Sequence, residues 1–589
     1  MSYNIQETSQ ISPIMSRRYK SQTELNCRRS GCLFCTMNEP DPTTRRSRLT
    51  KCFSQLHLRD DEDLVITLSC LWNIAVAQPN DAEFPSLGVF KCMAKLIERS
   101  INDRKWLSRG KNAYIPYYAA HIIGSYTMNK PPHAEIAIAS GVLPPLMELL
   151  RGKISWVEQR VAVRALGHLA SHRRTFKAII TTHDEEGIVN LAMNIASTCL
   201  DTVYTQFLSL KGYKRVEYHR ELMTRGHEGL EMENKKAEEW ASQLQSWSLY
   251  LLNCFAIKKK SVNLICKKQF LEDLSGMWGG LNNHQNSFSG VCLIRSLCLS
   301  KDGRRSIAMS NKVIQTLCNI SRSLDEWQYK AIESILLLLQ DQETRFRVMD
   351  LVVPFVVDLV ELKIIKRGGT TTFGDIITRV LLQDYGRIKY GQMIMKSKTS
   401  QKALEEVWNL KVERRKRDDM MSEQEFSERK VMVGMLKAEG NKKFRSGDIK
   451  VAVAKYTKAL ELCPLKMKRE RIVLYSNRAQ CYLLLREAEL AISDTTRALC
   501  LSGAMNPHTK SLWRRSQAYD MLKMARQSLM DCLMFINGRT KFKPKRHVKI
   551  PFYAVRMLNK QISATSLFGT SSVNNEAPTI MASRVQFRK

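Results

Sequence analysis

The chain has 589 residues, too many for one hydrophobic core, so several domains or an extended array of repeats are expected. Lysine and arginine outnumber aspartate and glutamate by 92 to 57, and the net charge of +35 indicates an acidic partner: nucleic acid, an anionic membrane surface or an acidic peptide. Because no apolar run reaches about eighteen residues and residues 1–20 lack an apolar signal core, we expect a protein that is neither membrane-spanning nor secreted.

Residues 1–55 are polar and aperiodic, and we expect them to be largely disordered. Within or near them, four thiols are spaced so that they could bind one tetrahedral zinc ion: Cys27, Cys32, Cys35 and Cys52. Because a second Cys-x-x-Cys pair is missing, metal-free or lipidated thiols are the favoured interpretation, zinc is the alternative, and no cofactor is predicted. The remaining cysteines lie in apolar helical patterns, which predicts a reducing compartment: the cytoplasm, with the nucleus as a second location.

Residues 56–400 follow the helical period, with apolar residues at steps of three and four between short Gly, Pro or Asn breaks. In the clearest unit a short helix ends at Gly141, Pro144 and Pro145 open the next helix, and an amphipathic third helix follows. This unit resembles an armadillo repeat. The resemblance implies stacked units that share a continuous core and a curved groove for an unnamed client or scaffold protein. His168 on the third helix is expected to be a helix-face histidine with satisfied hydrogen bonds.

Residues 401–432 form a charged helical stretch that we expect to link two repeat arrays. The basic run Lys411–Arg417 inside it favours a solvated helix face, with a nuclear-localisation patch as the alternative. No Ser–His–Asp constellation, paired metal-binding histidines, dinucleotide fingerprint or complete phosphate loop stands out. The sequence therefore predicts no catalytic centre.

Residues 433–562 change to a pattern that resembles tetratricopeptide repeats, which have a period of about 34 residues. Small residues allow two antiparallel helices to approach closely, and Gly447 is suited to the tight turn between them. The matching positions are Gly440, Ala452, Tyr456 and Ala459, then Ala479, Tyr482, Ala491 and Ala498, then Ser516, Tyr519, Ser528 and Phe535. A helix over 551–562 is expected to cap the third unit, and residues 563–589 to form a disordered tail.

Five polar residues fall on the first helices of these units: Lys437, Asn441, Asn477, Lys510 and Arg514. Their positions within the units are separated by steps of three and four, so they share one helix face. Lysine and arginine make strong charge-assisted bonds to carboxylates, and the amides add donors without adding repulsion. The five residues therefore predict a site for an acidic ligand.

All five residues match the clamp positions of carboxylate-clamp co-chaperones, which this stretch resembles. The resemblance implies binding of the Glu-Glu-Val-Asp C-terminus of the 70- and 90-kDa heat-shock chaperones, through its last side-chain carboxylate and its chain terminus. Lys443 and Phe444 are candidate contacts to upstream peptide residues. The order of the two arrays is similar to that in a group of plant proteins that join armadillo and tetratricopeptide repeats.

The sequence thus predicts an all-α protein made of two α-solenoids, acting as a non-enzymatic co-chaperone or adaptor. The alternative is a basic nuclear or nucleic-acid-associated scaffold, because residues 538–589 contain only one acidic residue, Glu576, among many lysines and arginines. A ubiquitin ligase is a third hypothesis, and no ligase module accompanies the helical repeats to favour it. The pattern leaves open which of the two chaperones the clamp prefers.

Overall fold

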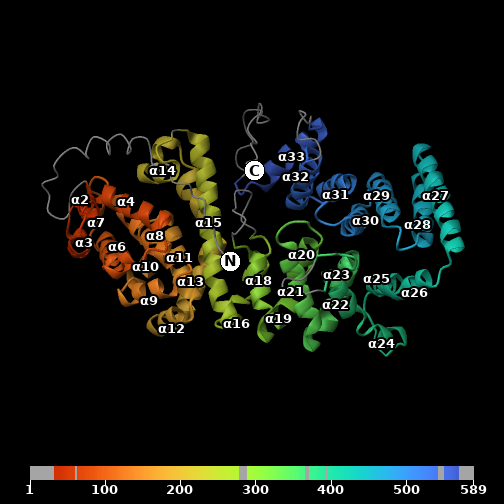
Figure 1. Ribbon diagram of the computed structural model, residues 1–589, viewed down its shortest axis with the longest axis horizontal. Coiled ribbons are helices and arrows are strands. Elements are labelled where there is room, and N and C mark those ends of the chain that lie inside the picture. Colours follow the sequence, from red (N-terminus) through yellow and green to blue (C-terminus); the bar gives the residue numbers. More distant parts are fainter. Residues whose placement is uncertain are drawn as a thin grey trace. The chain divides into compact units, whose positions relative to one another are not determined.

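The computed structural model describes residues 32–59, 63–227, 229–277, 288–364, 371–392, 394–541 and 550–568, and the side chains of these residues except 539–541. Within these ranges the chain is helical and has no β-strand, which confirms the predicted all-α fold. The chain divides into two compact units, residues 1–307 and 308–589 (Figure 1). No helix within the described ranges is both long and apolar enough to cross a membrane.

The first unit is built from helices joined by short connections. Its helices are α2 (Leu33–Met37), α3 (Pro42–Gln55), η1 (Leu56–Leu58), α4 (Asp63–Ala77), α5 (Glu83–Ser86), α6 (Val89–Asn102), α7 (Arg104–Leu107), η2 (Asn112–Tyr114), α8 (Ile115–Thr127), α9 (Pro131–Ala139), α10 (Leu143–Leu150), α11 (Trp156–Ser171), α12 (Arg173–Thr182), α13 (Glu185–Val203), η3 (Tyr204–Leu208), η4 (Gly212–Lys214), α14 (Glu217–Thr224), α15 (Leu230–Ile257), α16 (Val262–Ile265), α17 (Lys268–Leu274), α18 (Gly290–Leu297) and α19 (Lys301–Ala308).

The clearest armadillo-like unit comprises α9, α10 and α11, as its sequence predicts. Gly141 lies between α9 and α10 with φ +78°, a left-handed conformation that glycine adopts without a steric cost. Two prolines occupy the first turn of α10, where their missing N–H groups leave no helix bond unmade. Helices α4, α8, α11 and α15 pack in succession, and Gly167 of α11 lets the ring of Tyr250 on α15 approach closely.

The second unit begins with short and medium-length helices and ends with three helical hairpins and a last helix. Its helices are α20 (Asn311–Ser321), α21 (Gln328–Gln340), α22 (Gln342–Val356), η5 (Val357–Leu359), α23 (Phe373–Leu382), α24 (Tyr385–Lys389), α25 (Lys398–Trp408), η6 (Asn409–Glu413), α26 (Arg414–Asp419), α27 (Glu423–Arg445), α28 (Ile449–Leu462), α29 (Lys468–Leu484), α30 (Ala488–Ser502), α31 (Thr509–Met521), α32 (Ala525–Lys541) and α33 (Phe552–Thr565).

The hairpins are α27 with α28, α29 with α30, and α31 with α32 (Figure 1). Gly440 makes the first crossing possible, because a β-carbon there would lie 2.7 Å from the ring of Tyr456. In the third hairpin, serines occupy positions where alanine is usual. Ser516 Oγ donates to the carbonyl of Ser528 at 2.9 Å, and Ser528 Oγ donates to the carbonyl of Ser516 at 2.8 Å. The two buried hydroxyls are thereby satisfied across the helix crossing.

Helix α33 packs on α32 and covers the end of the third hairpin. Ala554 of α33 is fully buried in a cluster with Cys532, Phe535 and Ile536 of α32. The predicted capping helix is therefore present, beginning at Phe552 and ending at Thr565. It protects apolar surface that the last repeat would otherwise expose to water.

Buried ion pairs connect the hairpins to the helices that precede them in the same unit. Asp358 in η5 is 1% exposed and accepts hydrogen bonds from Arg497 Nε at 2.8 Å and Ser493 Oγ at 2.7 Å, both of which lie on α30. Arg497 also pairs with Glu406 of α25, and Arg471 of α29 pairs with Glu361 beyond η5. Ion pairs centred on buried arginines and Asp358 thus connect the hairpins to the helices that precede them in the second unit.

The two compact units divide the chain at a different place from the predicted domains. The predicted boundaries after residues 55, 400, 432 and 562 remain predictions, whereas the contacts divide the chain between Ile307 and Ala308. Within the predicted linker, Arg414 Nη2 donates to the carbonyls of Leu460 at 3.0 Å and Cys463 at 2.6 Å, at the end of α28. Part of that charged stretch is therefore packed against the hairpins instead of being solvated.

Candidate functional site

The five predicted clamp residues lie on the first helices of the three hairpins. Lys437 and Asn441 lie one turn apart on α27, Asn477 lies on α29, and Lys510 and Arg514 lie one turn apart on α31. We call the surface that carries these five residues the clamp face. Its assignment as a peptide-binding site remains a prediction, and the contacts below describe how the structure arranges it.

The two asparagines meet at the centre of the clamp face. Asn477 Nδ2 donates to Asn441 Oδ1 at 3.3 Å, and the same oxygen accepts a hydrogen bond from the hydroxyl of Tyr456 at 2.8 Å. Burial raises the pKa of Tyr456 to about 12, so its hydroxyl keeps its proton and remains a donor at neutral pH. The amide of Asn441 is held in one orientation, with its own N–H₂ group free of these two bonds.

Arg514 is fixed from α29 by three hydrogen bonds. Its Nε donates to Gln480 Oε1 at 3.0 Å, and its Nη1 donates to both the carbonyl and the hydroxyl of Ser476, each at 2.6 Å. None of these acceptors carries a charge. Burial lowers the pKa of the guanidinium, because a cation removed from water without a counter-ion is disfavoured. A half-buried cation held in this way is suited to receive an anion.

Lys510 is exposed at the start of α31 and lies within electrostatic range of His508 together with Arg514. Burial and these two cations lower the pKa of His508 to about 4, so the histidine is neutral at physiological pH. His508 Nδ1 lies 2.8 Å from the Ser511 hydroxyl, which donates to Ser476 Oγ at 3.2 Å. A chain of hydroxyl groups therefore connects the base of α31 to the arginine.

Lys437 is already paired within the protein. Its Nζ donates to Oε2 of Glu470 on α29 at 2.7 Å, in an ion pair whose side chains are 28% and 35% exposed. Sequence reasoning missed Glu470. The available signal was its spacing of seven residues from Asn477, which places both on one face of α29.

The two predicted upstream contacts have local partners. Lys443 Nζ pairs with Asp448 Oδ2 at 2.8 Å beside the turn between α27 and α28. Phe444 is half-buried and packs against the apolar core of the first hairpin. Their contact with a peptide remains a prediction, and these local interactions would have to be compatible with it.

The N-terminal cysteines are partly described. Cys27 lies outside the described residues, Cys32 and Cys52 are close enough to interact electrostatically, and burial raises the pKa of Cys52. Among the described residues, no group of three or more His, Cys, Asp or Glu side chains could hold a metal ion.

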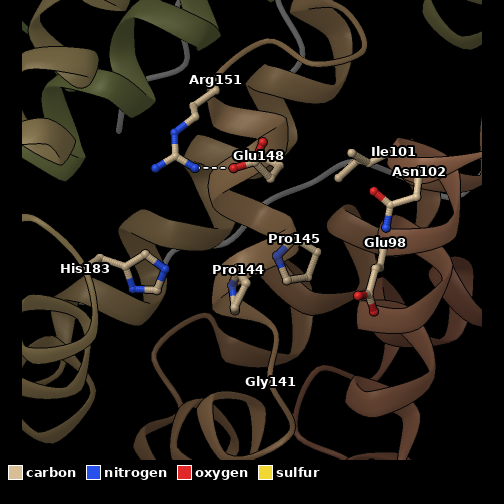
Figure 2. Close-up of a pocket in the computed structure, with 9 residues that line it drawn as sticks. All are labelled: Glu98, Ile101, Asn102, Gly141, Pro144, Pro145, Glu148, Arg151 and His183. Atoms are coloured by element: carbon tan, nitrogen blue, oxygen red, sulfur yellow. Dashed lines mark hydrogen bonds and ion pairs between the residues drawn. The ribbon is translucent and has the colours of Figure 1, made fainter.

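The first unit has an open surface pocket of about 580 Å³ between α6 and α10 (Figure 2). Pro144 and Pro145 form one wall, and Glu148 and Arg151 pair with each other at its rim. His183, which follows α12, also lines the pocket, and its ring lies on the side of the two prolines (Figure 2). The pocket is lined by residues of both charges and by two proline rings, and no set of hydrogen-bond donors converges on one point. The pocket therefore indicates no particular ligand.

A cluster of aromatic and cationic residues spans α4, α8, α11 and α15 in the first unit. The guanidinium of Arg160 lies 3.8 Å from the ring centroid of Trp240, which stacks on Tyr117. Trp72 Nε1 donates to His121 Nδ1 at 3.0 Å, which requires that nitrogen to be unprotonated. Burial and nearby arginines lower the pKa of His121 in agreement with this. Sequence reasoning missed this cluster. The pattern that could have indicated it is Arg160 and Arg164, two arginines one turn apart on the same helix.

His168 differs from its prediction in one respect. It lies on α11 and is 4% exposed, but neither ring nitrogen has a hydrogen-bond partner. Its imidazole packs instead against the rings of Trp247 and Tyr250, and burial lowers its pKa well below the usual value. A neutral imidazole between rings can be accommodated by packing, which the spacing of apolar residues does not reveal.

Ser155, Glu158 and His219 form a cluster that has the residue types of a hydrolytic triad. Ser155 Oγ donates to Glu158 and lies 3.0 Å from His219 Nε2, whereas His219 Nδ1 has no partner. In a triad the carboxylate orients the imidazole, but here it contacts the hydroxyl. Because Ser155 also accepts a hydrogen bond from the N–H of Val157, the cluster is the N-terminal cap of α11.

Comparisons with known proteins match the chain to one family model and, over short segments, to several curated proteins. A model described as plant ARM repeat matches residues 24–267, less than half of the chain. A segment of 87 residues is 40% identical to protein unc-45 homolog B of Danio rerio, covering 15% of this chain and 9% of that protein. Sperm-associated antigen 1A of Danio rerio is 37% identical over 100 residues, which are 16% of this chain and 22% of that protein.

A third relative, the mitochondrial import receptor subunit TOM70 of Rattus norvegicus, is 32% identical over 96 residues, which cover 16% of this chain and 15% of that protein. The chain thus spans less than a quarter of the length of each of these relatives. Among solved structures, a designed armadillo repeat protein matches 53% of the chain at 13% identity with a TM-score of 0.29. The chain is an all-helical protein in which residues 24–267 match the plant ARM repeat family.

Proposed function

We propose that the protein is a non-enzymatic adaptor or co-chaperone whose clamp face binds the acidic C-terminal tail of heat-shock chaperones of the 70- and 90-kDa classes. The observation that carries the proposal is the state of Arg514: half-buried, held by three neutral acceptors and without a carboxylate partner among the described residues. A carboxylate placed there would form charge-assisted hydrogen bonds and relieve the cost of burying the cation.

The other clamp residues support the same ligand. The Asn441 amide is oriented by Tyr456 and Asn477, and Lys510 is exposed one turn from Arg514. A short acidic peptide is bound by hydrogen-bond donors that lie on one face of the protein. The side chains of Asn441, Lys510 and Arg514 would be these donors. The helices of the armadillo-like part would hold a client or scaffold protein, in the cytoplasm and also in the nucleus.

The relatives are consistent with protein binding. One of them is named as a receptor subunit for mitochondrial import, and the segments compared are 32–40% identical to this chain. These matches cover small parts of the relatives, so the peptide-binding role depends on the clamp face and not on the names.

The proposal can be tested by titrating the full chain with a fluorescent peptide that ends in Glu-Glu-Val-Asp. Arg514→Ala and Lys510→Ala should each weaken binding by more than about tenfold, because hydrogen bonds to charged groups contribute about 1.5–3 kcal/mol. Lys450→Ala removes the same charge from an exposed position on the second helix of the first hairpin and should bind like the wild type. Equal affinity of all four proteins, or no binding by any, would refute the proposal.

A further inference from the structure

The ion pair between Lys437 and Glu470 places a carboxylate of the protein itself on the clamp face. We propose that Glu470 is an internal competitor, which occupies Lys437 until a carboxylate of the peptide displaces it. This inference rests on the proposed function and adds to it a residue that sets the affinity of the clamp.

The geometry of α27 and α29 places Glu470 beside the other clamp residues. Lys437 and Asn441 are four residues apart on α27, while Glu470 and Asn477 are seven apart, or about two turns, on α29. Two parallel cross-contacts therefore join the helices, Lys437 with Glu470 at 2.7 Å and Asn441 with Asn477 at 3.3 Å. The Glu470 carboxylate therefore occupies the Lys437 amine, which a carboxylate of the peptide would have to contact at this end of the clamp face.

The two ends of the clamp face consequently differ. At the α31 end, Arg514 is bonded to a carbonyl, a hydroxyl and an amide oxygen, none of which competes as an anion. At the α27 end, Lys437 has a negatively charged partner. A peptide with two carboxylates can therefore bind at Arg514 without displacing an anion, but it must displace Glu470 to bind at Lys437.

Glu470 is held close to the clamp face even when its side chain rotates away. The next residue, Arg471, is 1% exposed and pairs with Glu361, with Nη1 2.9 Å from Oε1. This buried pair fixes the first turn of α29, so displacement involves rotation of the Glu470 side chain and not movement of the helix. The Glu470 carboxylate therefore stays within reach of Lys437 and competes with the peptide for this lysine.

The expected size of the effect follows from exposure. Both side chains of the Lys437–Glu470 pair are partly exposed, and ion pairs in contact with water are weak and screened by salt. Glu470 should therefore reduce affinity moderately, by about two- to fivefold at low salt, and should not prevent binding.

The experiment measures the affinity of the full chain for the Glu-Glu-Val-Asp peptide in wild type, Glu470→Gln, Lys437→Met and the double variant, with melting curves to verify folding. Glu470→Gln should bind about two- to fivefold more tightly than wild type. In the Lys437→Met background the same substitution should change affinity little, because the lysine through which Glu470 acts is gone.

A matched control is Glu439→Gln, which removes a carboxylate from another ion pair of the same hairpin, with Lys455 at 2.6 Å. It should leave affinity unchanged. If Glu470→Gln binds no more tightly than wild type, or gains equally with and without Lys437, the internal competitor is refuted while the proposed function stands. If neither the wild type nor any variant binds the peptide, the proposed function is refuted, and this inference is refuted with it.

Discussion

Single residues on α27 show how closely the clamp face depends on the packing behind it. Tyr456 does two things at once: its ring fills the space left by the missing β-carbon of Gly440, and its hydroxyl orients Asn441. The glycine required for the helix crossing therefore also determines the position of a predicted ligand-binding amide. A substitution at Gly440 should affect both stability and binding.

Gly440→Ala is expected to destabilise the protein by about 1–3 kcal/mol, because its methyl group would lie 2.7 Å from a ring atom of Tyr456. Peptide affinity should fall as well, since the displaced hydroxyl no longer orients Asn441. Gly434→Ala on the same helix is the control: no atom lies within 4 Å of its added carbon, so stability should rise by about 0.5–1 kcal/mol. Urea denaturation and peptide titration of both variants measure these effects, and equal behaviour of the two would contradict the packing argument.

Buried histidines make stability depend on pH. Burial lowers the pKa of His219 to about 4, below its ordinary value of 6.5. Between these two pH values the unfolded chain binds a proton that the folded chain does not, so stability falls as the pH is lowered through this window. The slope from one such group is at most about 1.4 kcal/mol per pH unit.

His219→Gln should therefore lose less stability than wild type between about pH 6.5 and pH 4. Melting temperatures of both proteins across this range would show the difference. His227→Gln, which changes an exposed histidine, is expected to follow the wild-type curve. Parallel curves for wild type and His219→Gln would show that this histidine does not contribute to acid sensitivity.

At the scale of helices, the periodic parts of the fold were predictable and the long-range pairs were not. The small and aromatic positions of the repeats, such as Ala452 and Tyr519, are buried as their spacing predicts, because helix crossings recur at a local period. The spacing also identified α33. By contrast, Asp358 meets Arg497 across 139 residues, and no local pattern indicates which of many charges will pair.

The candidate site shows the same division. Position counting placed five residues on the first helices, and the structure brings Asn441 and Asn477 into contact. Position counting did not indicate that Lys437 is paired with Glu470. An acidic residue in the first turn of a helix, such as Glu470, is commonly solvated or stabilises the helix dipole. Competition between partners is a property of side-chain geometry, which residue types alone do not specify.

The buried charges around η5 predict that the hairpins depend on the helices before them. Asp358→Asn should destabilise the second unit by about 3–5 kcal/mol, since Arg497 and Arg322 would lose a buried counter-ion. Limited proteolysis at increasing denaturant concentration measures the effect: the hairpins of Asp358→Asn should be cleaved at a lower concentration than those of the wild type. Asp302→Asn, whose side chain is 59% exposed, provides the control and should change stability by less than about 0.5 kcal/mol. Little change in Asp358→Asn would show that the hairpins are stable without this cluster.

At the scale of the whole molecule, the net charge of +35 keeps a second function open: association with nucleic acid. The two functions differ in their response to salt. Non-specific binding releases counter-ions from the polyanion and weakens steeply with ionic strength, with a slope that grows with the number of phosphates contacted. A few half-buried contacts at Arg514 are screened less.

Binding to single-stranded RNA should accordingly weaken more steeply with salt than binding to the acidic peptide, and Arg514→Ala should impair only the peptide. Fluorescence anisotropy from about 50 to 200 mM salt measures both ligands under the same conditions. Strong RNA binding that persists in high salt and is reduced by Arg514→Ala would identify the clamp face as a nucleic-acid site instead.

The cysteines of both units have a consequence for observing how the protein opens. Burial raises the pKa of Cys92, Cys199 and Cys254 in the first unit, and of Cys318 and Cys500 in the second, to about 12. Thiols that are both shielded and protonated react slowly with alkylating reagents, because the thiolate is the nucleophile. Each of the two units therefore contains buried cysteines that alkylating reagents modify only after local unfolding. The order in which these cysteines are alkylated would show which unit unfolds first.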